Sequence, residues 1–387
     1  MKVETIEISC QNCGRRPRLV PDCHRRSRAA PAPRARGRCR HNETGAPIEQ
    51  YLQNAPFKKS GQLYLPLKEV ALSLEMHVNN NRKTKTIEVT GIQQYAKLQI
   101  GKSKAIGKDN KSISLGAPVI NKKGELYVPA SLFSKLFGVK ITVKTKKSIV
   151  YSYNAKYSMM KTGNALFWLN TKSSDLYMGL SGQLPKRIGK LPIEDPDWLY
   201  CKAAWQIDKS TYVLDINNDY GEPHINTTWY RILIHDGEIV QQSNMSFGGF
   251  SQGFPQENIV SSHGQIVMND GHKARLYTPE GQLAETLDLI KLGGAEDTYC
   301  IEAIEPDFLL IRPHSKGTLL LIDRKSGKQT PLYLSLLDKD SIERVEAFDF
   351  EINDGLKYTG RDGSILKFDW KAIGSKKVIH KTLDMSK

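Results

Sequence analysis

The stretch that decides the fold of the first domain is Gly61-Gln-Leu-Tyr-Leu-Pro-Leu-Lys-Glu-Val-Ala-Leu-Ser-Leu74, which returns as Gly124-Glu-Leu-Tyr-Val-Pro-Ala-Ser-Leu-Phe-Ser-Lys-Leu-Phe137. Its Gly, Leu, Tyr and Pro recur at a constant offset of 63 residues, from position 61 to position 124. A repeat at a fixed offset is the signature of a structural unit that occurs more than once. The sequence therefore predicts two copies of one supersecondary unit.

Each copy predicts a short strand followed by a helix. The Leu-Tyr-Leu or Leu-Tyr-Val segment has strand character, and the Pro after it suits the first turn of a helix, where a missing N–H costs nothing. Apolar residues then fall on one helical face. In the first copy they are Leu67, Val70, Ala71 and Leu74, and in the second Ala130, Phe133 and Phe137. After the helices, alternation over 86–90 and 140–143 predicts strands, with 79–81 and 144–147 as hairpin turns.

These repeated segments carry a resemblance to a known family. Together with the linking stretches 98–101 and 115–120, they resemble the copper amine oxidase N-terminal-like domain over residues 48–153. In that family the module is a noncatalytic stalk of small antiparallel strands and helices, common in surface and secreted proteins of Gram-positive bacteria. The resemblance implies an α+β module and an extracellular or cell-surface location.

The resemblance does not imply copper amine oxidase activity. That catalysis needs a His-x-His pair with a further His on copper, and a Tyr in an Asn-Tyr-Asp/Glu setting. None of the nine His residues forms His-x-His, and the chain has no Asn-Tyr dipeptide. We therefore expect no copper or quinone chemistry and no cofactor.

Composition and charge describe a globular chain with a basic front. Of 387 residues, 39% are hydrophobic and 25% are charged, which is typical of two or three globular domains. No apolar run approaches the roughly 18 to 20 residues that span a bilayer. The net charge is +15. Residues 48–153 hold eighteen Lys/Arg against six Asp/Glu, a net of +12, whereas residues 154–387 hold twenty-seven against thirty-one, a net of −4.

The Lys excess of the first module has two interpretations. It forms an ordinary solvated surface, or it attracts an anionic cell-wall polymer or glycan through screened electrostatics. No recognition helix, stacking motif or zinc-finger spacing accompanies the charge, so we expect no nucleic-acid partner. The turn residues that we predict to contact such a polymer are Lys83, Lys85, Lys122, Lys123, Lys144, Lys146 and Lys147.

Residues 1–47 differ from the rest of the chain. They hold ten Arg and one Lys and have no aromatic residue, so we expect a disordered tail. Its cysteines are weak zinc candidates because the second half of the cluster lacks metal-ligand spacing. They are Cys10, Cys13, Cys23 and Cys39. A further interpretation is that the tail, which has the composition of a shifted reading frame, is not the authentic start, and it contains no recognisable signal peptide.

Residues 155–387 read as many short strands joined by tight turns. A Gly preceded by a small or acidic residue recurs at Gly182, Gly237, Gly281, Gly327 and Gly363. The spacings of 55, 44, 46 and 36 residues favour four-stranded units, and hence an all-β domain, a β-propeller of about five or six blades. A β-sandwich is the alternative.

Catalytic signals in this second domain are weak. Glu194, Asp195 and Asp197 lie beside Pro192 and Pro196, which favours a solvated loop over an acid/base pair. The Phe247-Gly-Gly-Phe250 segment offers aromatic faces to a sugar or closes its own turn. Cys201 and Cys300 are either buried thiols or a disulfide between blades.

We therefore expect a noncatalytic exported or cell-surface protein of a Gram-positive-type bacterium. The Lys-rich module serves as a stalk or wall contact, and the propeller offers a binding surface. The alternative is an enzyme that acts on cell-wall or extracellular glycans from the propeller face.

Overall fold

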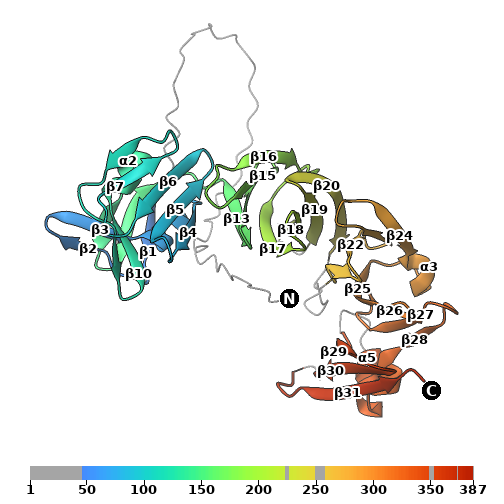
Figure 1. The fold of residues 1–387 in the computed structure, drawn as a ribbon. Coiled ribbons are helices and arrows are strands. Elements are labelled where there is room, and N and C mark those ends of the chain that lie inside the picture. Colours follow the sequence, from blue (N-terminus) through green and yellow to red (C-terminus); the bar gives the residue numbers. More distant parts are fainter. Residues whose placement is uncertain (1–45, 223–225, 249–257, 348–352, 373, 387) are drawn as a thin grey trace, which may run out of the picture.

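The computed structural model describes residues 46–222, 226–248, 258–347, 353–372 and 374–386. The predictions for residues 1–45, including disorder and a zinc site at Cys10, Cys13, Cys23 and Cys39, lie outside the described residues. Figure 1 shows a compact α+β module followed by a series of β-sheets. No helix among the described residues is long and apolar enough to cross a membrane.

The first module consists of three antiparallel sheets and two short helices around one core. The three-stranded sheet has the order β1 (Pro47–Tyr51), β12 (Ser148–Ser152), β11 (Thr142–Thr145). The four-stranded sheet has the order β2 (Phe57–Lys59), β3 (Gln62–Pro66), β10 (Glu125–Pro129), β9 (Ile120–Lys122). The five-stranded sheet runs β4 (His77–Asn81), β5 (Thr86–Gly91), β6 (Gln94–Gln99), β7 (Lys104–Gly107), β8 (Ser112–Ser114). The helices are α1 (Leu67–Ser73) and α2 (Ser131–Leu136).

The two copies of the repeat pair with each other about a local pseudo-twofold axis. Strand β3 of the first copy lies antiparallel to β10 of the second, with Tyr127 opposite Pro66 and Pro129 opposite Tyr64. The two tyrosine hydroxyls follow the same symmetry. Tyr64 donates to the Pro118 carbonyl at 3.0 Å and Tyr127 to the Ala55 carbonyl at 3.4 Å, and these acceptors are themselves 63 residues apart. The repeat is therefore a structural duplication whose halves complete one sheet.

The predicted strand-to-helix units are present. The side chains of Leu67, Val70 and Phe133 have no exposed surface, and each helix buries the predicted face. Three details differ from the prediction. The predicted turn at 144–147 spans only residues 146–147, because residues 144 and 145 belong to strand β11. The prolines end the strands and do not enter the helices, because Pro66 is the N-cap of α1 and Pro129 closes β10. Residues 79–81 belong to strand β4 rather than to a turn, because the backbone reverses at residues 82–85.

The second domain is β-propeller-like, a series of five antiparallel sheets in which the strands follow chain order. Sheet 1 contains β13 (Tyr157–Thr162), β14 (Ala165–Asn170), β15 (Asp175–Leu180) and β16 (Lys186–Lys190). Sheet 2 contains β17 (Trp198–Gln206), β18 (Thr211–Tyr220), β19 (Asn226–His235) and β20 (Glu238–Phe247). Sheet 3 contains β21 (Ser261–Ser262), β22 (Gln265–Asn269), β23 (Lys273–Tyr277) and β24 (Leu283–Asp288). Sheet 4 contains β25 (Tyr299–Ile304), β26 (Phe308–Pro313), β27 (Leu320–Asp323) and β28 (Gln329–Pro331). Sheet 5 contains β29 (Leu356–Asp362), β30 (Ile365–Trp370) and β31 (Ile379–Asp384).

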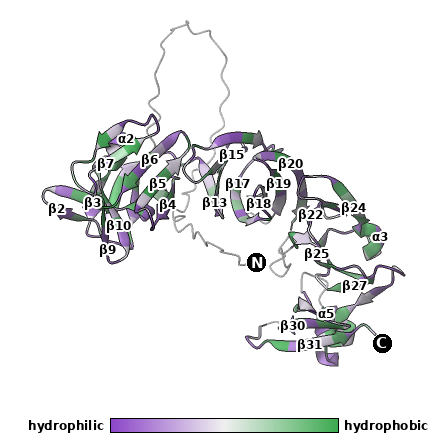
Figure 2. Ribbon diagram, in the orientation of Figure 1, coloured by the Kyte–Doolittle hydropathy of each residue, from purple (hydrophilic) through white to green (hydrophobic). Residues whose placement is uncertain are grey.

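Three short helices accompany these sheets: α3 (Leu289–Gly293) after sheet 3, and α4 (Leu332–Leu336) and α5 (Lys339–Ala347) before sheet 5. Figure 1 shows the sheets following one another along an open arc. Hydrophobic and hydrophilic residues are interspersed along their strands (Figure 2). The blade number of about five or six stays a prediction, because an open arc does not close into a ring of defined size.

The recurring glycines occupy the tight turns for which they were expected. All five have positive φ, from 58° at Gly363 to 85° at Gly182, a conformation that glycine adopts without a steric penalty. In sheets 1 to 4 this glycine joins the third strand to the fourth. Gly363 instead joins β29 to β30, the first two strands of sheet 5. The last spacing in the sequence is therefore shorter because it ends at a different hairpin.

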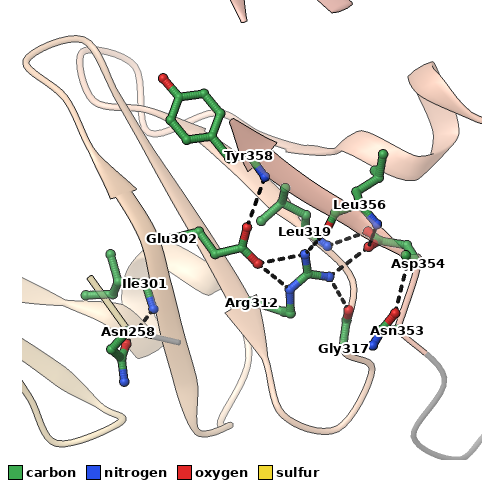
Figure 3. Close-up of polar contacts among 11 residues, drawn as sticks. Asn258, Ile301, Glu302, Arg312, Gly317, Leu319, Asn353, Asp354, Leu356 and Tyr358 are labelled. Atoms are coloured by element: carbon green, nitrogen blue, oxygen red, sulfur yellow. Dashed lines mark hydrogen bonds and ion pairs between the residues drawn. The ribbon is translucent and has the colours of Figure 1, made fainter. Parts of the chain in front are cut away.

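Buried arginines fasten consecutive sheets of the arc to one another. Arg231 of sheet 2 pairs with Asp215 of the same sheet at 2.8 Å and donates to the Val267 carbonyl of sheet 3 at 3.0 Å. Figure 3 shows the corresponding contact between sheets 4 and 5, where Arg312 lies between Glu302 and Asp354. In each link the guanidinium group donates to a backbone carbonyl of the next sheet, which an apolar side chain would leave without a partner.

Candidate anion-binding surface

The seven predicted lysines lie in three separate turns or strand ends of the module, and all are exposed. Lys83 and Lys85 lie in the β4–β5 turn, Lys122 and Lys123 at the β9–β10 turn, and Lys144, Lys146 and Lys147 at the β11–β12 hairpin. Lys144 makes an ion pair with Glu49 at 2.5 Å, and the ammonium of Lys122 lies 4.1 Å from the centre of the Phe57 ring. Their role in binding stays a prediction.

A different set of lysines surrounds a hollow on the solvent-facing side of the five-stranded sheet. Lys97, Lys102 and Lys104 line a shallow groove of about 430 Å³ that contains no acidic residue in its lining. The other lining side chains are mainly small or polar, and the apolar Ile106 side chain in the lining is 41% exposed. The pairing of the strands explains the arrangement, because Lys97 on β6 lies opposite Ile106 on β7.

The sequence held a signal for this groove. Lys97 stands between Ala96 and Leu98, which are both buried, so strict alternation places it on the outer face of a strand. Lys102 and Lys104 follow at the start of β7. The sequence could not show that β6 and β7 pair and bring these three cations to one place. Ammonium groups around a concave surface without nearby carboxylates offer multiple point charges to phosphate or carboxylate groups.

Beside this sheet, Glu75 forms the junction between the module and sheet 1. Its carboxylate accepts hydrogen bonds from the Tyr153 hydroxyl at 2.9 Å and from the backbone N–H groups of Lys156 and Tyr157 at 2.5 and 2.6 Å. Its carbonyl accepts from the Trp168 indole of sheet 1 at 2.9 Å. Burial raises the pKa of the Glu75 carboxyl above its usual value, although these hydrogen bonds act in the opposite direction.

His77 supports the same junction from the start of β4. Its ring lies 4.8 Å from the Trp168 ring in an edge-on arrangement, and burial lowers its pKa to about 4. The imidazole is therefore neutral at physiological pH and packs as part of the contact.

The duplication explains why Glu75 is unusual. It occupies the position after α1 that Gly138 occupies after α2, and both residues have positive φ, 57° and 72°. A glycine costs nothing there, whereas an L side chain is strained. The first copy therefore carries a strained glutamate at the place where the module contacts the next domain.

We expect Glu75→Gly to lower the free energy of unfolding by about 2 kcal/mol. The three donors are only partly buried, so each should cost about 1 kcal/mol, at the low end for an unpaired donor, and relief of the positive φ returns about 1 kcal/mol. Thermal and urea unfolding of the full chain measure the change. Gln93→Gly is the matched control, because Gln93 has the same φ of 57° in an exposed turn. If Glu75→Gly changes the free energy of unfolding by the same amount as Gln93→Gly, or raises it, the Glu75 contacts do not stabilise the junction.

The catalytic and redox candidates of the second domain are not brought together. Among the described residues, no group of three or more His, Cys, Asp or Glu side chains could hold a metal ion. Cys201 and Cys300 are buried thiols on sheets 2 and 4 and form no disulfide. Burial raises the pKa of the Cys201 thiol to about 12, so it is protonated at physiological pH.

The geometry defines a duplicated α+β module joined to β-propeller-like sheets, and comparison with known proteins identifies the module. The family model of the copper amine oxidase N-terminal domain matches residues 45–152, which confirms the resemblance noted from the repeat. No curated protein matches the chain.

Several solved structures match the chain at low identity and low TM-score. YCF48 bound to D1 peptide is 10% identical, with 86% of this chain and 85% of that chain covered and a TM-score of 0.28. The dihydro-heme d1 dehydrogenase NirN in complex with DHE is 10% identical over 66% of this chain, with a TM-score of 0.26, and the chain spans 46% of its length. A protein of unknown function from Bacteroides caccae is 9% identical over 76% of this chain and 88% of its own, with a TM-score of 0.25. With such low TM-scores, nothing about function follows from these similarities.

Proposed function

We propose that this chain is a noncatalytic exported or cell-surface protein of a Gram-positive-type bacterium. Its Lys-rich module contacts an anionic cell-wall polymer, and the sheets of the second domain, as blades of a propeller of about five or six, present a binding surface. The observation that carries the proposal is the groove lined by Lys97, Lys102 and Lys104. It lies on a module with a net charge of +12, attached to a domain with a net charge of −4.

The physical basis is long-range attraction followed by multiple weak contacts. Exposed ion pairs contribute about 0.2–1 kcal/mol each, so a polymer that engages several lysines at once gains affinity that one contact cannot provide. Such contacts weaken beyond a Debye length of about 8 Å in physiological salt. Binding should therefore fall steeply as salt is added.

We expect the triple variant Lys97→Ala, Lys102→Ala, Lys104→Ala to bind teichoic-acid-bearing cell walls about tenfold more weakly than the native chain, because three exposed contacts are worth about 1.5 kcal/mol together. Cosedimentation with purified walls across a salt series measures this. The matched control replaces three exposed lysines of the second domain by Ala: Lys186, Lys190 and Lys209. Walls stripped of teichoic acid should retain none of these three proteins.

A second variant separates the groove from the turns. Replacing Lys83, Lys85, Lys146 and Lys147 by Ala removes a larger charge but leaves the groove intact. If this variant loses more binding than the groove variant, the turn lysines are the main contact. Retention that is insensitive to salt, or equal in all variants, would overturn the proposal.

A further inference from the structure

Sheet 2 has one face that its neighbour only partly covers. Strands β18, β19 and β20 have ten residues each, whereas β22 and β23 of sheet 3 have five. The contact with sheet 3 begins at Arg231, which donates to the Val267 carbonyl, and continues through the apolar pair Val213 and Leu233. Beyond this contact, Trp229 packs with Met245 and Phe247 of β20 and with Cys300 of sheet 4, and the rest of the face extends toward Trp198.

Strand register places a set of aromatic and polar side chains on this half. Tyr200, Asn217 and Trp229 lie directly opposite one another across β17, β18 and β19. Two residues further along the strands, Trp198 lies opposite Asp219, so it shares their face. We call these five residues the aromatic face. The opposite face of the sheet packs apolar residues such as Leu199 and Ile216 into a core with sheet 1.

The aromatic face combines an exposed ring with hydrogen-bonding groups held in fixed positions. The Trp198 side chain is 54% exposed, and its ring centre lies 6.5 Å from that of Tyr200. The Tyr200 hydroxyl donates to Asp219 at 3.1 Å and accepts from the Asn217 amide at 3.2 Å. Burial, with a further contribution from Asp219, raises the pKa of Tyr200 to about 12, so its hydroxyl keeps its proton.

Two buried polar atoms of this face have no partner among the described residues. They are the Asn217 carbonyl oxygen Oδ1, an acceptor, and the Trp229 indole Nε1, a donor. Both side chains are more than nine-tenths buried, at 4% and 5% exposure. A buried polar atom without a partner is costly, so its presence points to a ligand or solvent group that completes it. Asn217 and Trp229 are opposite each other on paired strands, and an acceptor and a donor so placed match a hydroxyl group, which can donate and accept.

The charges at the aromatic face are of both signs, which disfavours a strongly charged ligand. Asp219 is an anion, whereas the Lys202 ammonium and the Arg231 guanidinium lie 4.7 and 5.5 Å from the centre of the Trp229 ring. The acidic loop that precedes Trp198 is held from the opposite face, where Asn218 of β18 accepts from the Asp197 backbone N–H at 3.0 Å and donates to the Asp195 carbonyl at 3.3 Å. A neutral ligand with an apolar face and several hydroxyls fits this combination, and a pyranose sugar has that structure.

We propose that the aromatic face of sheet 2 binds a neutral oligosaccharide, with a sugar ring stacked on Trp198 and hydroxyl groups bonded to Asn217 and Asp219. This inference rests on the proposed function only in placing a binding surface on the second domain. It adds the ligand class and the site, and it is independent of the lysine groove.

The test measures binding of cellotriose and of the N-acetylglucosamine trimer to the full chain by calorimetry. We expect at least one to bind and Trp198→Ala to weaken binding at least about tenfold, as for a central aromatic contact. Trp198→Phe should retain more affinity, because it keeps a ring. Asn217→Ala should also weaken binding. Tyr51→Ala is the matched control, because Tyr51 is an exposed aromatic residue of the other domain, at 75%.

The outcomes separate this site from the anion surface. Sugar binding should be insensitive to salt and unchanged in the Lys97/Lys102/Lys104 triple variant. Absence of binding by both sugars at millimolar concentration would overturn the inference and leave the wall-binding test unaffected. Equal binding by the Trp198→Ala variant, with its melting temperature unchanged, would also overturn it. Sugar binding that is lost with the groove lysines would place the sugar on the module instead.

Discussion

Replacing Arg312 by Ala should lower the free energy of unfolding by about 3–5 kcal/mol, because it leaves two carboxylates buried without their cation. Arg312 is 1% exposed and lies between Glu302 of its own sheet at 2.7 Å and Asp354, next to sheet 5, at 2.8 Å. It also donates to the carbonyl groups of Gly317 and Leu356. Figure 3 shows how these contacts converge on one guanidinium.

Arg312 stays protonated in the native state. Burial alone lowers the pKa of Arg312, but Asp354 and Glu302 outweigh this effect and raise it above its usual value. Asp354 also accepts from the Leu319 backbone N–H at 2.7 Å, so the cluster organises the chain between sheets 4 and 5. Loss of the arginine should therefore loosen sheet 5 as well as lower global stability.

Urea unfolding measures the change in free energy, and hydrogen exchange locates it. Arg187→Ala is the matched control, because Arg187 pairs with Asp175 at 2.7 Å but is 51% exposed. Exposed pairs are worth about 0–1 kcal/mol. If both variants lose the same small amount, the Arg312 cluster does not fasten the last sheets. Faster exchange confined to residues 356–384 would identify sheet 5 as the part that is released.

The second large effect should appear at Phe133, for which we expect Phe133→Ala to cost about 3–5 kcal/mol. Phe133 is fully buried on α2 and its ring centre lies 6.1 Å from that of Phe137. The duplication supplies a matched control, because Val70 stands at the equivalent position of α1 and is equally buried. Val70→Ala removes fewer atoms and should cost less, at the low end of about 2 kcal/mol.

The comparison tests the duplication as well as the packing. Both residues face the single core of the module, so the module should unfold in one cooperative transition in each variant. Thermal unfolding, followed by far-ultraviolet circular dichroism, measures the two costs. If Val70→Ala costs as much as Phe133→Ala, the loss of stability does not follow the side-chain volume removed. The two copies would then not be equivalent in packing.

Local patterns in the sequence predicted those features that depend on neighbouring residues. The repeat at an offset of 63 predicted two strand-to-helix units, and helical spacing predicted that Leu67 and Val70 are buried. Glycines in hairpin signals predicted positive φ at Gly182 and its counterparts. The sequence predicted less accurately where a strand ends and its turn begins. Residues 79–81 were predicted as a turn but end β4, because Asn is compatible with both.

The candidate sites depended on the pairing register between neighbouring strands. Lys97 and Lys104 meet because β6 pairs with β7, and Asn217 lies opposite Trp229 because β18 pairs with β19. Tertiary structure alone decides this register, since turn residues limit but do not fix which strands meet.

The sequence by itself determined the duplication, the helical faces and the turn glycines, because these features follow from spacing and backbone conformation within a few residues. Only the tertiary structure decided that the two copies complete one sheet, that Glu75 stands in a glycine position to hold sheet 1, and that Arg312 joins carboxylates 10 and 42 residues away. The physical reason is that hydrogen bonds and ion pairs act over a few ångströms in space, whatever the separation along the chain.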